Sequence, residues 1–503
     1  MSLKLNIAAN YAGQVYTGLV GIAMVPLYLR LMGAEAYGLV GFFTLLQAWS
    51  LVLDLGMSGT VSREAARHAA GTLEAAALRH LLRSLEWLFW PAGLAMAVLT
   101  GLAAPAIAGR WLQIQSLHLP EVELAVALMG LAIGIRWASG LYRGVITGLE
   151  RQVWLNGFNS LFVSLRFLGV LPVMAIFGAT PVPFFAFQAL VSTLEFWVLA
   201  SRTYKWVPLP PGVRAHGSWA ALQPVLEFSG GIAVATIVWV FVTQADKLII
   251  SNLLPLAEYG FFTAAVMAAS AITMFSGAVT QALLPRLTRL AQQQDPAAFI
   301  ALYRHATELT AALAGPLTLA LALFGEPMLW AWTGNRDFAA RYAPVLTLYA
   351  IGNGFMALAA FPYYLQYARG NLRLHLWGTL GFALVLVPFI TAASMRYGPL
   401  GAGWVWATSN ALFFIFWSAY VHKRLQPGLH RSWLVRDVLR VLVLPCLLGV
   451  ALAFAFPRDA GRWWSATLVG VVALLMMLAG LALSDLARPR LRAICTRLAP
   501  RMR

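Results

Sequence analysis

The sequence predicts an all-α polytopic membrane protein, and three observations lead to this fold class. Hydrophobic residues make up 60% of the 503-residue chain, charged residues only 11%, and the mean hydropathy is +0.73. Soluble domains carry about 25% charged residues, and disordered chains combine low hydrophobicity with high charge, so both classes are excluded. The apolar residues form many runs that match the roughly 20 residues of a membrane helix. Basic residues are concentrated in alternate connections between these runs.

Apolar runs bounded by charged residues or by Gly and Pro clusters predict about fourteen transmembrane helices. The first run continues directly into the repeated pattern of spans, so it is predicted to be a retained helix rather than a cleaved signal sequence. Several runs are longer than one span and require tilt or an extension along the membrane surface. In chain order the helices are expected at residues 8–32, 36–62, 80–109, 122–148, 154–178, 181–206, 227–254, 258–285, 299–330, 340–365, 372–396, 399–422, 435–456 and 464–485.

The positions of Lys and Arg predict the topology. With the N-terminus placed inside, 26 of the 36 basic residues, Arg143 among them, fall on the inside, six on the outside and four within spans. This bias follows the positive-inside rule, so we expect an even number of spans with both termini in the cytoplasm. The longest outside connection, near residues 325–340, is too short to house a catalytic domain, so the chain is predicted not to be an enzyme.

The formal net charge of +17 is expected to serve topology and contact with anionic lipids. No separate basic domain exists, so no nucleic-acid partner is predicted. The basic tail at residues 487–503 is expected to be cytoplasmic, either lying on anionic lipid or solvated. Cys446 and Cys495 lack the spacing of a disulfide framework or a metal site, and Walker and nucleophile-elbow sequences are absent. We therefore predict no catalytic residue, no metal and no cofactor.

Two stretches about 220 residues apart share a pattern that indicates an internal repeat. A Tyr-Gly pair follows the first predicted helix at Tyr37 and the seventh at Tyr259, and basic residues end the fourth and tenth helices at Arg151 and Arg369. Six helices separate the copies, so both share one orientation, which is typical of transporters built from two lobes. Chance recurrence of Tyr-Gly turns is the alternative. We expect two six-helix lobes related by a parallel repeat, two C-terminal helices and a tail, at residues 1–210, 211–430, 431–486 and 487–503.

Ionisable residues within predicted spans are the candidate site residues, because such groups are costly in a membrane and usually face the bundle interior or water. The cations are expected to form a cavity for an anionic headgroup, since the arginine fork donates paired hydrogen bonds to phosphate. These substrate-binding candidates are Arg30, Arg136, Arg166 and Lys247. The acids, which would serve either ion coupling or charge pairing, are Asp54, Glu195, Asp246 and Glu308.

Pairing among these charges is the structural alternative to substrate binding. Arg166 and Glu195 lie at nearly equal depths in the fifth and sixth predicted helices, so they are a candidate ion pair. Asp246 and Lys247 point about 100° apart around one helix and are expected not to share a face. One of them would then face the cavity while the other pairs with a neighbour. Arg30 lies near the outer end of its helix and could instead extend to the membrane surface.

Motifs in both halves of the chain resemble those of the polysaccharide transport family, within the MATE-like superfamily of multidrug, oligosaccharidyl-lipid and polysaccharide exporters. The resemblance covers about residues 5–425, and the order and spacing of the motifs carry it. In chain order these are Asn10 with Pro26, Arg30, Gly33 and residues 35–38, then 54–56, then 144–151 with Asn156, then 246–251, and finally 257–260.

This resemblance implies a fold of twelve core helices in two lobes, often with two more. It also implies alternating access that moves undecaprenyl-diphosphate-linked oligosaccharide (an O-antigen, capsule or exopolysaccharide unit) across the bacterial inner membrane. Glycan polymerase and glycosyltransferases of the same pathway would be protein partners. Lipid II flippases of the superfamily carry cationic cavity residues, which is similar to Arg30, Arg136, Arg166 and Lys247 here. Without an ATPase motif, drive would come from an ion gradient, the membrane potential or consumption of the product.

A MATE-like cation-coupled exporter of drugs or small molecules is the main alternative. Multidrug members commonly use an acidic residue in the first helix, and residues 8–32 contain no Asp or Glu. A membrane-embedded glycan enzyme would need an outside loop with paired acids, which this sequence lacks. An assembly scaffold and a lipid II flippase are further alternatives.

Overall fold

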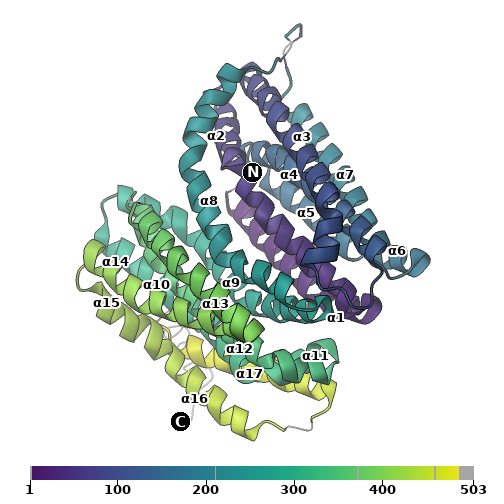
Figure 1. The fold of residues 1–503 in the computed structure, drawn as a ribbon. Coiled ribbons are helices and arrows are strands. Elements are labelled where there is room, and N and C mark those ends of the chain that lie inside the picture. Colours follow the sequence, from purple (N-terminus) through teal and green to yellow (C-terminus); the bar gives the residue numbers. More distant parts are fainter. Residues whose placement is uncertain (1–2, 210, 214, 371–372, 458–459, 486–503) are drawn as a thin grey trace, which may run out of the picture. The chain divides into compact units, whose positions relative to one another are not determined.

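The computed structural model describes residues 3–209, 211–213, 215–370, 373–457 and 460–485, and every named element in these ranges is a helix (Figure 1). The predicted all-α class is therefore confirmed. The first compact unit, Met1–Gly260, is called unit 1, and the second, Phe261–Arg503, is called unit 2. The predicted tail at residues 487–503 lies outside the described residues.

Unit 1 contains the helices that carry most of the predicted site residues. A short 3₁₀ segment, Leu51–Asp54, follows α1, and a π-helical turn, Ile107–Trp111, extends α3. Its helices are α1 (Leu3–Ser50), α2 (Met57–Ala69), α3 (Ala75–Ala106), α4 (Leu119–Gly148), α5 (Gln152–Phe167), α6 (Val170–Phe177), α7 (Pro181–Trp206), α8 (Trp219–Leu253) and the first turn of α9 (Leu256–Gln292).

Unit 2 contains the rest of α9 and the remaining helices. Two π-helical segments, Phe413–Trp417 and Trp433–Leu439, interrupt its later part. Its helices are α10 (Pro296–Leu323), α11 (Gly325–Thr333), α12 (Arg336–Ala368), α13 (Arg373–Leu412), α14 (Ser418–Leu425), α15 (Leu429–Ser432), α16 (Arg440–Ala455) and α17 (Arg462–Leu483). Both α16 and α17 pack against α10, so the last two predicted helices belong to the same unit as the helices before them.

Within the described residues, twelve helical stretches are long and apolar enough to cross a membrane. Two of them, Asn10–Asp54 and Arg373–Leu425, each cover two predicted helices. Each is interrupted by a glycine with positive φ, Gly33 at 82° and Gly398 at 60°, a conformation that glycine adopts without steric cost. These breaks fall where the sequence predicts a boundary between helices, while the count of fourteen stays a prediction.

The two compact units divide between Gly260 and Phe261, and the predicted lobe boundary at residue 210 stays a prediction. The structure places α8 with unit 1 because this helix packs against α1, α2 and α3. The predicted parallel repeat between two six-helix lobes stays a prediction.

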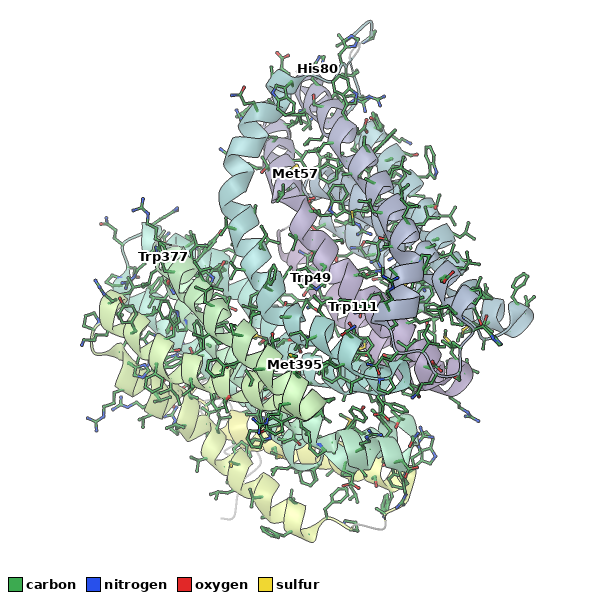
Figure 2. The ribbon with its side chains drawn as sticks, viewed as in Figure 1. Trp49, Met57, His80, Trp111, Trp377 and Met395 are labelled. Carbon is green, nitrogen blue, oxygen red and sulfur yellow. The ribbon has the colours of Figure 1, made fainter. Side chains whose placement is uncertain are left out.

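Large apolar side chains cover the outer surface of the helices. Trp377 and Met395 on α13 are 72% and 69% exposed (Figure 2), and Trp197 on α7 is 62% exposed. Exposed apolar surface on this scale marks contact with a membrane or a partner. Together with the twelve apolar helical stretches, it fits helices that are surrounded by lipid.

The first Tyr-Gly motif is part of a packed corner in unit 1. Glu35, only 7% exposed, accepts hydrogen bonds from the backbone N–H groups of Gln115 (2.6 Å) and Ser116 (2.9 Å) and from the Ser116 hydroxyl. A Cβ added to Gly38 would overlap the carbonyl oxygen of Leu256, in the first turn of α9. Glu35 of the motif therefore fixes the connection before α4, and Gly38 allows the first turn of α9 to approach α1 closely.

Candidate anion-binding cavity

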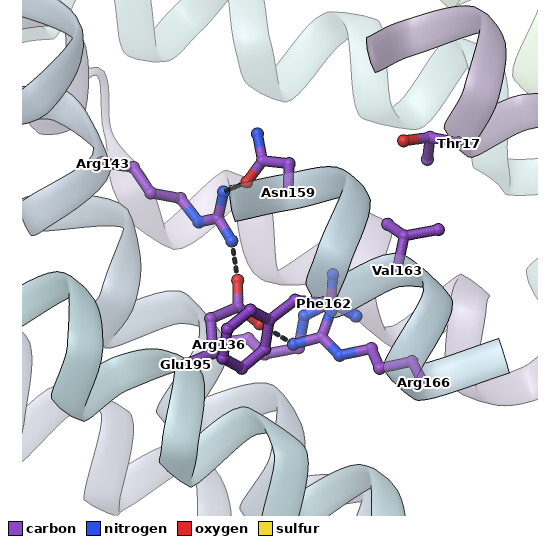
Figure 3. Close-up of a pocket in the computed structure, with 8 residues that line it drawn as sticks. All are labelled: Thr17, Arg136, Arg143, Asn159, Phe162, Val163, Arg166 and Glu195. Carbon is purple, nitrogen blue, oxygen red and sulfur yellow. Dashed lines mark hydrogen bonds and ion pairs between the residues drawn. The ribbon is translucent and has the colours of Figure 1, made fainter. Parts of the chain in front are cut away.

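A cavity of about 250 Å³ lies among α1, α4, α5 and α7 within unit 1 (Figure 3). Three arginines and one glutamate supply its charged groups, and Thr17, Asn159, Phe162 and Val163 complete the lining. Two of the arginines and the glutamate were singled out from the sequence as candidate site residues. The charged lining residues are Arg136, Arg143, Arg166 and Glu195.

Helix geometry explains how these side chains converge. Arg136 and Arg143 are seven residues apart on α4, and Asn159 and Arg166 are seven apart on α5, so each pair lies about two turns apart on one face. The opposite side of α4 packs tightly: a Cβ on Gly93 of α3 would lie 2.7 Å from the carbonyl oxygen of Gly134. Close packing of α4 on α3 therefore leaves its arginine face turned toward α5 and α7.

Glu195 on α7 is the anion at the centre of the cavity. Its side chain is 2% exposed, and one carboxylate oxygen pairs with Arg143 while the other pairs with Arg166. Arg143 also donates to Oδ1 of Asn159. The predicted Arg166–Glu195 pair is confirmed. A buried carboxylate is costly unless it is paired, so the two guanidinium groups stabilise Glu195 in place.

Arg136 differs from the other two arginines. No hydrogen bond or ion pair joins its guanidinium to any residue in the described ranges, and Figure 3 shows it beside the Arg166–Glu195 pair. In addition, Nε of Arg166 is buried without a hydrogen-bond partner. Three guanidinium groups and one carboxylate give the cavity a formal charge of +2. This donor set suits an anion such as phosphate rather than a metal ion.

The other two predicted cations do not line this cavity. Arg30 is exposed on α1. Nζ of Lys247 lies 3.1 Å from both carboxylate oxygens of Asp246 and 2.7 Å from the carbonyl oxygen of Thr243. The two positions lie about 100° apart around α8, but the long, flexible lysine stem carries its charge back to the neighbouring carboxylate, so the two residues pair with each other.

The remaining predicted acids have local partners. Asp54 accepts hydrogen bonds from the hydroxyl (2.5 Å) and the backbone N–H (3.4 Å) of Ser58 at the start of α2. In unit 2, Glu308 pairs with Arg440 at 2.8 Å and accepts from the backbone N–H of Asp485 at 3.2 Å. These contacts stabilise helix ends and helix pairs; ion coupling at Asp54, Glu195, Asp246 or Glu308 stays a prediction.

Sequence reasoning missed Arg143 and Asn159. Arg143 was counted among the inside basic residues because it lies near the end of its span. The available signal was its spacing of seven residues from Arg136, which places both side chains on one helix face. For Asn159 the same spacing to Arg166 was available, although a single asparagine in a span is more often a helix–helix contact.

Comparisons with known proteins identify the fold. The solved structure of the lipid II flippase MurJ in an inward closed conformation matches with a TM-score of 0.75 at 12% identity, covering 97% of this chain and 100% of that one. An inward-facing MATE family multidrug transporter of the MOP superfamily matches with a TM-score of 0.59 at 12% identity, covering 85% and 96%. The chain thus has the fold of MurJ- and MATE-like membrane transporters, and it is a multi-pass membrane protein.

The family follows from the sequence match. A family model described as "Polysaccharide biosynthesis protein" matches residues 3–291, so the chain belongs to this family. A protein of Shigella flexneri named "Putative O-antigen transporter" is 23% identical over 411 residues, which are 81% of this chain and 94% of that protein. The resemblance to polysaccharide transporters stated from the sequence motifs is confirmed.

Proposed function

We propose that this protein is a flippase that translocates an undecaprenyl-diphosphate-linked oligosaccharide across the bacterial inner membrane by alternating access. In this proposal the diphosphate binds to Arg136, Arg143 and Arg166. The family, the O-antigen transporter relative and the MurJ-like fold support a flippase of lipid-linked oligosaccharides in general. The single observation that carries the proposed site is the cavity of charge +2 in which Arg136 has no partner among the described residues.

The physical need for such a cavity is clear. A diphosphate with attached sugars cannot cross hydrocarbon unaided, because an unpaired charge in a medium of low dielectric constant is prohibitively costly. Arginine forks replace the lost water with charge-assisted hydrogen bonds, each worth about 1.5–3 kcal/mol. The cargo would be an O-antigen, capsule or exopolysaccharide unit.

Glu195 has a specific part in this mechanism. It pairs with Arg143 and Arg166 and offsets one of their two positive charges, and Arg136 offers the first contact to an incoming anion. A bound diphosphate then competes with the carboxylate for the other two guanidinium groups. Protonation of Glu195 would release both arginines, which is how an ion gradient would couple to binding.

A MATE-like exporter of cationic drugs is the competing function. A cavity with a net positive charge repels a cationic substrate, so the described site favours the anionic cargo. The proposal also includes cytoplasmic termini, contact with anionic lipids, cooperation with the polymerase and glycosyltransferases of the same pathway, and no enzymatic activity of the chain itself. Reporter fusions at each terminus would test the topology.

Deletion of the gene followed by complementation tests the function. We expect loss of the surface glycan and accumulation of the lipid-linked intermediate on the cytoplasmic face, measured with a membrane-impermeant lectin on spheroplasts and on inverted vesicles. Arg136→Ala should fail to restore export, whereas Arg110→Ala, at an exposed arginine outside the cavity, should restore it. A normal glycan together with altered sensitivity to cationic drugs would instead establish the competing function.

A further inference from the structure

A second buried carboxylate in unit 1 has no part in the proposed mechanism. Glu86 of α3 is 4% exposed, and its two oxygens have different partners. One oxygen accepts from Arg83 at 2.9 Å, and the other accepts from the hydroxyls of Tyr142 (2.8 Å) and Tyr204 (2.6 Å). Tyr142 is on α4 and Tyr204 is on α7, so one carboxylate joins three helices. Buried polar groups with all their partners in place make the surrounding structure rigid.

Tyr142 is held at both ends of its side chain. Its hydroxyl donates to Glu86 and accepts from Nε1 of Trp90 (3.1 Å), which lies one turn further along α3. The hydroxyl hydrogen and one lone pair are thus both engaged by α3. The ring is fully buried and packs edge-on against Phe196 of α7, with 5.5 Å between the ring centroids. Rotating α4 about its axis, or sliding it along α7, would break these contacts.

The Tyr142 contacts lie directly beside an ion pair of the anion-binding cavity. Tyr142 and Arg143 are neighbours on α4, and Glu195 and Phe196 are neighbours on α7. Two adjacent residues of one helix therefore meet two adjacent residues of the other, one pair through aromatic rings and one pair through charges (Figure 3 shows the charged pair). The ring pair fixes the register of α4 against α7 at which the Arg143 guanidinium reaches the Glu195 carboxylate.

We propose that Tyr142 is a positioning residue for the anion-binding cavity. Held on α3 by its hydroxyl, it keeps Arg143 in the register at which the guanidinium lines the cavity. The inference rests on the proposed function, because it concerns the same diphosphate site. Among the described residues, the lining of the cavity includes Arg143 and not Tyr142, so Tyr142 acts on the ligand through its neighbour. Binding groups keep a productive geometry only when packing and hydrogen bonds behind them hold it.

Binding of inorganic pyrophosphate to the purified full-length protein tests this role. Tyr142→Phe keeps the packed ring and removes the hydroxyl, so α4 loses its hydrogen bonds to Glu86 and Trp90. We expect the affinity for pyrophosphate to fall by about three- to tenfold, which corresponds to one neutral hydrogen bond.

Tyr204→Phe is the matched control for this substitution. It removes a hydroxyl from the same Glu86 oxygen, but on a helix that carries none of the three cavity arginines. Both variants should lower the melting temperature by similar amounts, because each leaves Glu86 with one donor fewer. Only Tyr142→Phe should lose affinity for pyrophosphate.

A double-mutant cycle on the affinity distinguishes positioning from a general loss of stability. If Tyr142 acts through Arg143, Tyr142→Phe should weaken binding in the wild-type background and have no further effect in the Arg143→Ala background. Arg136 and Arg166 remain in that background to bind pyrophosphate. A purely structural role would instead reduce the affinity by the same factor in both backgrounds.

Unchanged affinity in Tyr142→Phe, an equal loss in Tyr204→Phe, or equal factors in the two backgrounds would overturn the inference and leave the cavity assignment intact. Should Tyr142→Phe fail to fold, Trp90→Phe takes its place in the cycle, because it removes the other bond to the Tyr142 hydroxyl at a side chain that is 46% exposed. If wild-type protein does not bind pyrophosphate, the proposed function fails, and this inference fails with it.

Discussion

Arg136 and Arg143 lie two turns apart on one face of α4, yet only Arg143 is paired with Glu195. The two side chains thus have the same access to the cavity and different electrostatic states. One arginine is held by an internal carboxylate, and the other has no partner in the described part of the chain. This asymmetry makes Arg136 the residue whose removal should affect ligand binding with little effect on the stability of the fold.

Arg136→Ala is expected to weaken binding of pyrophosphate to the purified protein by about ten- to a hundredfold, which corresponds to the loss of one charge-assisted hydrogen-bonded contact. Isothermal titration would measure this change. Arg110→Ala, which removes an exposed arginine, should leave the affinity within about twofold because exposed charges are screened by salt. Equal affinities for the wild type and Arg136→Ala would remove this arginine from the binding site.

Glu195→Gln should destabilise the protein by about 3–5 kcal/mol, because Arg143 and Arg166 lose their buried counter-charge. Thermal unfolding in detergent would show a lower melting temperature. Glu64→Gln is the control: its ion pair with Arg67 spans 2.9 Å at the surface, and such pairs contribute about 0–1 kcal/mol. Similar losses of melting temperature in both variants would mean that burial of the Glu195 ion pairs does not increase their contribution to the stability of the protein.

The pairing of Arg166 with Glu195 also predicts non-additivity. Arg166→Met combined with Glu195→Leu should be less destabilising than the sum of the two single substitutions, with a coupling free energy of about 0.5–3 kcal/mol. A double-mutant cycle of unfolding free energies would measure this coupling. Strict additivity would contradict the direct contact between the two side chains.

Gly38→Ala should destabilise unit 1 by about 1–3 kcal/mol, because the added methyl group overlaps a backbone carbonyl that cannot move independently. Gly59→Ala on α2 offers a matched control, since a Cβ there has no atom within 4 Å. That control should be neutral or slightly stabilising, because alanine favours a helix over glycine. A melting temperature for Gly38→Ala equal to that of the control would show that α9 does not approach α1 this closely.

Glu35→Gln should release the connection before α4. The Glu35 carboxylate accepts three hydrogen bonds from Gln115 and Ser116 through its two oxygens. The glutamine amide has only one acceptor oxygen, so it cannot accept all three. Hydrogen exchange of the amides at residues 113–117 should become faster, while exchange within α4 should stay unchanged. Unaltered exchange in this connection would mean that other contacts hold it.

Composition and periodicity were sufficient to predict the helical class and most helix positions, since membrane helices must be long and apolar. Depth along a helix was sufficient to predict the ion pair between Arg166 and Glu195, because two opposite charges at one depth on neighbouring helices can meet. Direction around a helix was a poor guide for Lys247, whose charge lies far from its Cα and returns to Asp246. Arg143 was missed because it lies near the end of its predicted span and reads as a basic residue of an inside loop. Its spacing of seven residues from Arg136 would have placed it on the same helix face.

The division into compact units between Gly260 and Phe261 could not be predicted from a linear pattern. The predicted lobe boundary at residue 210 follows from the repeat and stays a prediction, whereas compactness depends on which helices pack together. The structure groups α8 with α1, α2 and α3, and only three-dimensional contacts contain this information.

The counter-charge in the cavity, Glu195, is part of the protein chain, and this has a consequence for the transport cycle. A soluble counter-ion would leave the cavity with each round, whereas a covalently attached carboxylate remains when the cargo departs. In a flippase of the kind proposed, the unloaded carrier resets with one of its three guanidinium charges already balanced, which lowers the need to carry a second anion in the opposite direction. One-way delivery of cargo, rather than obligatory exchange for another anion, is then the expected stoichiometry.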